Sequence, residues 1–215
     1  KMPPSTHDFA LMDMAFSNGD DYFLARHQPG TAESRYALFP GCQMGASMPQ
    51  LVQQVYRDLS QRLDGGVGLI LGCCGAIADW AGDQPLLQQE LEKIRAAWQQ
   101  LGEPQMITLC PSCYAAFQQA DIPAVHIVTL LSELGLPMQS GQQNGVLAVH
   151  DSCTTRFDRS LQDTVRALAQ QAGYTIEELP YSREKTHCCG YGGLTSMVNQ
   201  EVNQATIQQC IGQSE

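Results

Sequence analysis

The hydrophobic residues after position 35 alternate between short continuous runs and longer stretches with helical spacing. Continuous apolar runs are typical of strands buried on both faces, whereas apolar residues three and four apart indicate helices that pack on one side. The runs predict strands at 36–39, 67–71, 106–109 and 125–128. The periodic stretches predict helices at 49–63, 85–101, 111–120 and near 130–134.

The same order begins again after a polar, glycine-containing linker at Gln139–Gly145. Strands are predicted at 146–150 and 174–179, and helices at 161–172 and 201–210, the last beginning near Ser196. Strands that alternate with helices indicate βαβ units. We therefore expect an α/β fold of two tandem, pseudo-symmetric, small Rossmann-like domains with mainly parallel sheets.

The domain boundaries follow from breaks in this pattern. Residues 1–35 are polar and interrupted by Pro3-Pro4, Asn18-Gly19 and Pro29-Gly30, so they are expected to form a loose leader or linker. The first domain is predicted at 36–140 and the second at 141–215.

Composition excludes several classes of partner. The chain has 215 residues, with 12 Lys and Arg against 22 Asp and Glu, a net charge of −10 and a hydrophobic fraction of 43%. The apolar content is enough for a packed core, whereas the acidic balance argues against nucleic acid or an anionic membrane surface as the main partner. No segment approaches the ~20 apolar residues of a membrane span, and no export signal is visible. We expect a cytoplasmic protein.

The cysteine content carries the strongest chemical signal. The chain has nine cysteines, an odd number, and it is not a small secreted domain. A disulfide scaffold is therefore a poor interpretation, because clustered thiols in a reducing compartment more often bind metal or carry redox chemistry.

The cysteines repeat together with the strands. In the first half Cys42 is followed 31 positions later by Cys73-Cys74, and Cys110 and Cys113 begin 36 positions after Cys74. Each group follows the end of a predicted strand, and the carboxyl ends of parallel strands face one crevice. The spacing therefore predicts that all five lie around one point. The second half repeats the pattern in part, with Cys153 followed 35 positions later by Cys188-Cys189.

Five thiols, two of them adjacent, suit some metal groups better than others. A tetrahedral zinc ion takes four ligands, usually as two spaced pairs. An iron–sulfur cluster spreads its ligands over several irons, so neighbouring thiolates can bind different metals. Gly75 and Gly190, which follow the two cysteine pairs, fit a backbone packed against such a cluster because glycine has no Cβ. Both interpretations stay open on the residues alone.

The doubled pattern of a single Cys, a Cys-Cys-Gly and a Cys-x-x-Cys resembles the cysteine-rich CCG domain. This domain occurs in the B subunit of heterodisulfide reductase and in iron–sulfur subunits of glycolate, lactate and glycerol-3-phosphate oxidation systems. The resemblance covers the chain from Tyr36 to the C-terminus. It implies a non-cubane [4Fe–4S] cluster at each complete motif, and it implies these ligands: Cys42, Cys73, Cys74, Cys110, Cys113, Cys153, Cys188 and Cys189.

The resemblance also implies a function and partners. We expect an iron–sulfur oxidoreductase module of the heterodisulfide-reductase type, with a flavin- or ferredoxin-containing redox subunit as its partner in a larger complex. In the disulfide-cleaving members of the family, a cluster iron binds one substrate sulfur while electrons arrive singly. Two alternatives remain: an iron–sulfur subunit of a hydroxy-acid oxidation complex, and a zinc-binding or redox-sensing module without catalysis.

The second motif departs from the family pattern. By analogy with the first half, a Cys-x-x-Cys is expected 36 positions after Cys189, at about position 225, but the sequence ends at Glu215. We therefore expect the second domain to be incomplete here. Cys210 lies only 21 positions after Cys189, inside a predicted helix, and is expected to be an ordinary buried thiol.

Overall fold

The computed structural model of the chain describes residues 4–137 and 145–213. These residues form two compact units, Lys1–Ile127 and Val128–Glu215, which are described separately. The predicted linker, apart from Gly145, lies outside the described residues. The predicted boundary between the domains near residue 141 stays a prediction.

A five-stranded sheet forms the centre of the first unit. Its strand order is β1-β3-β2-β4-β5, with β1 antiparallel to β3 and the other neighbouring pairs parallel. The strands are β1 (Leu24–Arg26), β2 (Tyr36–Phe39), β3 (Val67–Leu71), β4 (Gln105–Thr108) and β5 (Ala124–His126). All four predicted strands of this half are present, within three residues at each end.

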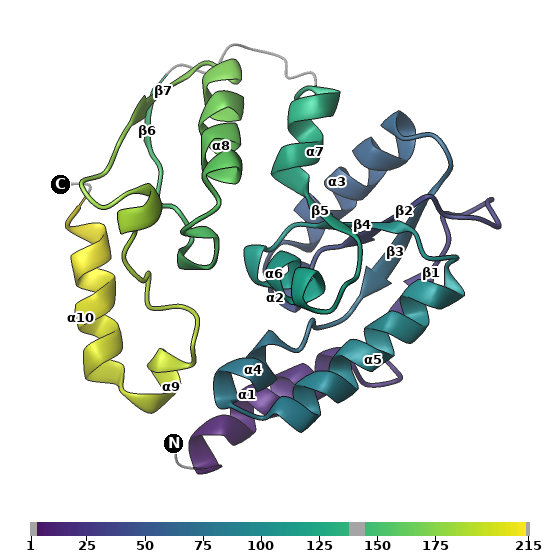
Figure 1. Ribbon diagram of the computed structural model, residues 1–215, viewed down its shortest axis with the longest axis horizontal. Helices are drawn as coiled ribbons and strands as arrows, with labels where there is room; N and C mark the ends of the chain where they lie inside the picture. Colours follow the sequence, from purple (N-terminus) through teal and green to yellow (C-terminus); the bar gives the residue numbers. More distant parts are fainter. Residues whose placement is uncertain (1–3, 138–144, 214–215) are drawn as a thin grey trace. The chain divides into compact units, whose positions relative to one another are not determined.

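The strand order fixes where the helices lie. The chain leaves the central strand β2 toward β3 on one side and later returns to β4 on the other, and right-handed crossovers then place the connecting helices on opposite faces. Figure 1 shows α3 and α5 on opposite sides of the strands. The helices of this unit are α1 (Pro4–Ser17), α2 (Cys42–Ser47), α3 (Pro49–Arg62), α4 (Ala76–Ala81), α5 (Gln84–Gln100) and α6 (Pro111–Gln119). Helix α7 (Ile127–Leu134) begins at the last residue of this unit and otherwise belongs to the second.

The main core of this unit lies between the sheet and helices α5 and α6. Phe39 of β2 and Phe117 of α6 are fully buried and meet edge to face with ring centroids 4.9 Å apart. Ile70, Ile94 and Met106 complete the same cluster. Full burial of each such side chain contributes about 1.5–3 kcal/mol, so this layer holds the strand ends that carry the cysteines.

The first 35 residues differ from the expected leader. Helix α1 packs against α4, and Met14 is buried against Cys73 and Ala78. Strand β1 adds an antiparallel edge to the sheet through pairing of Leu24 with Leu71. The sequence pattern missed both elements because α1 has almost no amphipathic periodicity and β1 has only three residues.

The second unit is built on a two-stranded parallel sheet. Its buried apolar side chains include Leu161 and Leu168 of α8, together with Leu179 and Leu194. All four residues of β6 are exposed, so this sheet is covered far less than the first. The elements are β6 (Gly145–Ala148), α8 (Arg159–Gln171), β7 (Tyr174–Glu177), α9 (Thr195–Val198) and α10 (Gln200–Ile211), with short 3₁₀ turns η1 (Cys153–Thr155) and η2 (Arg183–Lys185).

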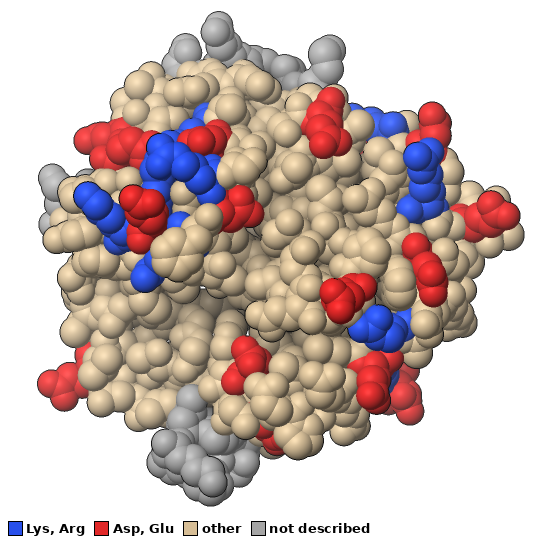
Figure 2. Space-filling view, viewed as in Figure 1, with Lys and Arg blue, Asp and Glu red and all other residues tan. Residues whose placement is uncertain are grey.

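A buried ion pair joins the parts of the second unit. Arg166 of α8 makes two parallel hydrogen bonds to Asp151, each 2.9 Å, and also bonds Glu178. The backbone N–H of Arg183 donates to Asp151 at 2.6 Å, and the Thr186 hydroxyl donates to the Asp151 carbonyl. Figure 2 shows Lys and Arg gathered with Asp and Glu over α8 and β7. This network ties the strand end before Cys153 to the segment before Cys188.

The predicted fold class is confirmed: the chain is a mixed α/β protein with a mostly parallel five-stranded sheet. The tandem pseudo-symmetry stays a prediction. Within the described part of the chain, every helix is too short or too polar to cross a bilayer.

Candidate functional site

Five cysteines meet at the carboxyl edge of the first sheet. Cys42 follows β2 as the first residue of α2, Cys73 and Cys74 follow β3, and Cys110 and Cys113 follow β4 at the start of α6. The central strand β2 lies between β3 and β4, where the chain reverses direction across the sheet. Crevices of α/β sheets open at such a switch point, which explains why residues far apart in sequence converge here.

The five side chains form a continuous series of contacts. The Cys42 Sγ lies 3.5 Å from the Cys73 Sγ and donates to it. Cys73 in turn bonds Cys74, Cys74 bonds Cys113, and Cys113 bonds Cys110. The convergence expected from the spacing is therefore present in the structure.

Hydrogen bonding divides these groups into donors and acceptors. The hydrogen bond to Cys73, with burial, raises the pKa of Cys42 far above its ordinary value. Cys73 accepts from Cys42, which lowers its pKa, but its hydrogen bond to Cys74 and its burial outweigh this and raise the pKa to about 12. Hydrogen bonds to Cys110 and Cys74, together with burial, raise the pKa of Cys113 strongly.

Cys74 and Cys110 are the acceptors. Hydrogen bonds from Cys113 and Cys73 lower the pKa of Cys74 well below its ordinary value, although burial opposes the shift. The hydrogen bond from Cys113 lowers the pKa of Cys110 to about 6 against burial, and backbone N–H groups of Cys113 and Ser112 add to this effect. Hydrogen bonding thus shifts the pKa values of Cys74 and Cys110 toward the thiolate, which is the form that binds metal.

The site is closed on one side and open on the other. Cys73, Cys74 and Cys113 are only 1–3% exposed, whereas Cys42 and Cys110 are half-buried. Cys74 and Cys113 belong to the main core cluster between the sheet and helices α5 and α6. Cys73 belongs to the smaller apolar cluster that contains Met14. A group held here would be shielded from solvent by the fold on the side of Cys73 and Cys74.

Gly41 leaves room for this arrangement. Its φ of +80° lies in the left-handed region, and a Cβ there would lie 2.9 Å from the Cys113 Sγ. Only glycine allows the backbone to approach the thiols so closely. The glycines proposed for this role, Gly75 and Gly190, have other reasons: a Cβ on Gly75 would meet Leu87 of α5, and one on Gly190 would meet Ile207 of α10.

Asn18 is a site residue that the sequence did not reveal. Its buried side chain pairs with the backbone of Cys73 in both directions, accepting from the N–H at 2.7 Å and donating to the carbonyl at 3.0 Å. The Asn18 Nδ2 also donates to the Glu90 carboxylate, and the Lys93 Nζ donates to the backbone carbonyl of Asn18. A Cβ on Gly72 would lie 2.7 Å from the Asn18 Oδ1. Asn18 thus positions the Cys73 loop, and only long-range packing identifies it.

The cysteines of the second unit have a different environment. Cys153, Cys188 and Cys189 are all exposed. Cys210, expected to be buried, is half-buried, and its Sγ lies 3.5 Å from the His150 Nδ1. Burial first, and then the nearby Cys189 and Cys188, raise the pKa of Cys210. Cys210 therefore lies close to the second cysteine pair rather than in a separate core.

The donor set of the first unit can be compared with the two candidate metal groups. Among residues 4–137 and 145–213, no three His, Cys, Asp or Glu side chains are arranged around a position for one metal ion. Five contiguous thiols exceed the four that a zinc ion takes, and the adjacent Cys73 and Cys74 suit a group with several metals. The residues present fit a polynuclear iron–sulfur group better than a single ion.

Fold and site together define a cysteine-rich α/β protein with a mostly parallel sheet. The chain matches the CCG cysteine-rich domain over residues 36–118 and 147–213, and it belongs to this family. It is also similar to the EtfAB:quinone oxidoreductase of Syntrophomonas wolfei subsp. wolfei, with 25% identity over 176 residues. That similarity covers 75% of this chain and 24% of the relative, so the chain spans about a quarter of the relative's length. No solved structure matches the chain.

Family and relative together support an iron–sulfur redox module in general. The expected family resemblance is confirmed. The assignment of individual ligands stays a prediction.

Proposed function

We propose that the chain is an iron–sulfur electron-transfer module of the heterodisulfide-reductase type. Its first unit would hold one non-cubane [4Fe–4S] cluster through Cys42, Cys73, Cys74, Cys110 and Cys113. The observation that carries the proposal is the unbroken contact series of these five thiols, which come from three loops and lie at one switch point of the sheet.

Each part of the site has a role in holding such a group. The lowered pKa values of Cys74 and Cys110 favour the thiolate form, while the other three thiols would release their protons when metal binds. Asn18 and Gly41 keep the backbone in place around them. A bound cluster would accept and release single electrons, and its potential would respond to burial and to hydrogen bonds on the sulfurs.

The proposed ligands of a second site are Cys153, Cys188 and Cys189 of the second unit. Three exposed thiols leave a cluster open to water and oxidants. We therefore expect the chain as given to retain about four irons, the content of one [4Fe–4S] cluster, rather than twice that number.

The name of the similar protein supports a role of this chain in electron transfer. It is an EtfAB:quinone oxidoreductase, so this domain type occurs in an enzyme that handles electrons between redox partners. We propose a flavin- or ferredoxin-containing subunit as the partner of this chain. A small disulfide or a hydroxy acid is the proposed substrate class of the complex, with the cytoplasm as its location.

Metal analysis tests the proposal directly. The protein is purified without oxygen and assayed for iron, acid-labile sulfide and visible absorbance that bleaches on reduction. About four irons and a similar amount of sulfide per chain are expected. Cys42→Ser and Cys110→Ser should each lose or alter the cluster, while Cys210→Ser should keep the wild-type content. A colourless protein without iron would overturn the proposal.

One observation favours a zinc-binding module as the second candidate. The 3.5 Å between the Cys42 and Cys73 sulfurs is close to the roughly 3.8 Å edge of a tetrahedral zinc–thiolate site. The same metal analysis separates the candidates, because zinc at about one per chain without inorganic sulfide would support this second candidate.

A further inference from the structure

A pocket of about 350 Å³ lies beside Cys42 in the first unit. The end of α1 and the following turn contribute Phe16, Ser17 and Tyr22 to its wall. The start of α2 contributes Cys42, Gly45 and Ala46. We call this space the Cys42 pocket. Its volume lies within the range of about 300–1,000 Å³ that is common for small-molecule sites.

The wall of the Cys42 pocket is apolar and uncharged. Its lining residues include no Lys, Arg, Asp, Glu or His side chain. The Ser17 hydroxyl donates to the Asp13 carbonyl, so its hydrogen is already used within α1. A charged ligand would lose its hydration here without gaining a partner, which is unfavourable. The pocket therefore selects for neutral, largely apolar molecules.

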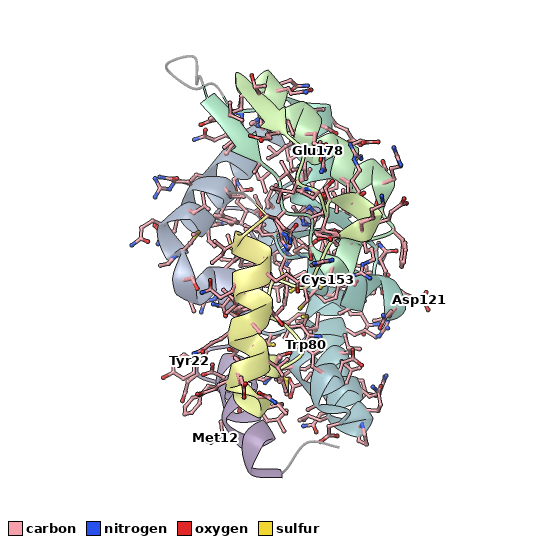
Figure 3. The ribbon with its side chains drawn as sticks, turned by 90° about the vertical axis from the view of Figure 1, so that its left-hand side faces the viewer. Met12, Tyr22, Trp80, Asp121, Cys153 and Glu178 are labelled. Carbon is pink, nitrogen blue, oxygen red and sulfur yellow. The ribbon has the colours of Figure 1, made fainter. Side chains whose placement is uncertain are left out.

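Two aromatic side chains form the rim of the pocket. Phe16 and Tyr22 are 61% and 65% exposed, and their rings meet edge to face with centroids 6.4 Å apart. In Figure 3 Tyr22 extends away from the ribbon beyond α1. Because the two rings are in contact and adjoin an apolar pocket, they form one continuous apolar surface, which is the kind of surface that marks ligand-binding grooves. A flat ring entering the pocket would stack on or against them.

Small residues of α2 leave open space at the bottom of the Cys42 pocket. A Cβ at Gly45 would meet no atom within 4 Å, so the space above α2 stays open because the side chain is absent. Gly72, in contrast, is packed tightly against Asn18 and Phe23. The missing side chain at Gly45 therefore enlarges the pocket, and no close neighbour requires a glycine at this position.

We propose that the Cys42 pocket binds a neutral, flat, ring-bearing small molecule against α2, beside the thiol series. This inference goes beyond the proposed electron-transfer role and does not depend on it, because the wall of the pocket is formed mainly by side chains that are not proposed cluster ligands. Such a ligand would lie with its ring between the Phe16–Tyr22 rim and the small residues of α2. Its edge would reach Cys42, one of the two half-buried cysteines of the site.

The test uses 2-naphthol as a neutral fluorescent probe and 2-naphthalenesulfonate as its charged counterpart. Binding to the full chain is measured by fluorescence anisotropy, with and without metal. The neutral probe should bind in both forms, and the charged probe should bind at least about tenfold more weakly. Equal binding of the two probes, or no binding of the neutral one, would overturn the proposal, whatever the metal content proves to be.

Substitutions that fill or open the pocket locate the binding. Gly45→Leu should weaken 2-naphthol binding on the order of tenfold or more, because its side chain would fill the space of the pocket, and Gly45→Ala should weaken binding less, because a Cβ at this position meets no neighbouring atom. Tyr22→Ala should weaken binding several-fold. Phe157, an 87% exposed aromatic of the second unit, provides the control, since Phe157→Ala should leave binding unchanged. The proposal would be overturned if the Gly45→Leu variant had the circular dichroism spectrum of the wild type and still bound 2-naphthol with wild-type affinity.

Discussion

Both units place cysteines on the carboxyl side of their strands but hold them by different physical means. In the first unit three of the five thiols are almost fully buried beneath a five-stranded sheet, and the N-terminal segment packs against their loops. In the second unit Cys153, Cys188 and Cys189 are exposed above a two-stranded sheet. The same sequence motif is therefore buried in one unit and exposed in the other, because the burial of the cysteines depends on how many other elements pack around them.

The supporting interactions differ as well. Asn18, a neutral amide, fixes the Cys73 loop by backbone hydrogen bonds. In the second unit a charged pair, Arg166 with Asp151, fixes the loop before Cys153. The first arrangement holds the Cys73 backbone through a neutral amide, whereas the second holds its loop through an ionised carboxylate.

The largest expected difference concerns metal retention. Cys74→Ser should reduce iron from about four per chain to near zero, because it removes a buried cysteine ligand from the middle of the contact series. Cys188→Ser should leave the iron content within error of wild type. Iron and sulfide analysis after purification without oxygen measures both. Equal loss in the two variants would show that the units share one cluster, and the comparison would fail.

The next effect concerns the buried ion pair. Arg166→Leu should destabilise the second unit by about 3–5 kcal/mol, because it leaves the Asp151 carboxylate buried without its partner. Hydrogen exchange of peptides from α8 and β7 measures this, and peptides of the first sheet should keep their protection. Arg159→Ala is the matched control, since its 4.0 Å ion pair with Asp163 is exposed and should contribute less than about 1 kcal/mol.

A smaller effect is expected at Asn18. Asn18→Ala should cost about 1–3 kcal/mol, because the Cys73 N–H and carbonyl lose buried hydrogen bonds. Hydrogen exchange at Cys73 and Cys74 should accelerate, and iron should be lost faster in air. Ser17→Ala serves as the neighbouring control, with less than about 1 kcal/mol expected. Wild-type exchange at Cys73 in the Asn18 variant would remove Asn18 from the site.

The smallest effect is a pH dependence confined to the second unit. Burial opposes ionisation of Asp151, but hydrogen bonds from Arg166 and Arg183 hold its pKa below the ordinary value. A hydrogen bond from Arg166 likewise lowers the pKa of Glu178. A lowered folded-state pKa adds stability above the unfolded pKa, near 4, and this stability is lost as the pH falls through the folded value. Exchange in the second unit should therefore accelerate below about pH 4 before the first unit changes, and Arg166→Leu should abolish that difference.

Much of the fold could be predicted because it depends on local patterns. The apolar runs at Tyr36–Phe39 and Val67–Leu71 match β2 and β3 residue for residue, since strands buried on both faces need continuous hydrophobic sequence. Short elements escaped prediction. Helices α2 and α4 have six residues each, too few to show a period, and they begin next to the cysteines.

The sequence by itself determined which cysteines could converge, because their spacing from the strand ends is a property of the chain and the carboxyl ends of parallel strands share one edge. Only the tertiary structure decided how they are held. Asn18 lies 55 positions from Cys73, and the division into thiolates and thiols depends on which sulfur donates to which. The open space above Gly45 and the burial of Arg166 against Asp151 likewise arise where distant segments pack. The periodicity of hydrophobic residues does not reveal such contacts, because each contact joins two positions that lie far apart in the sequence.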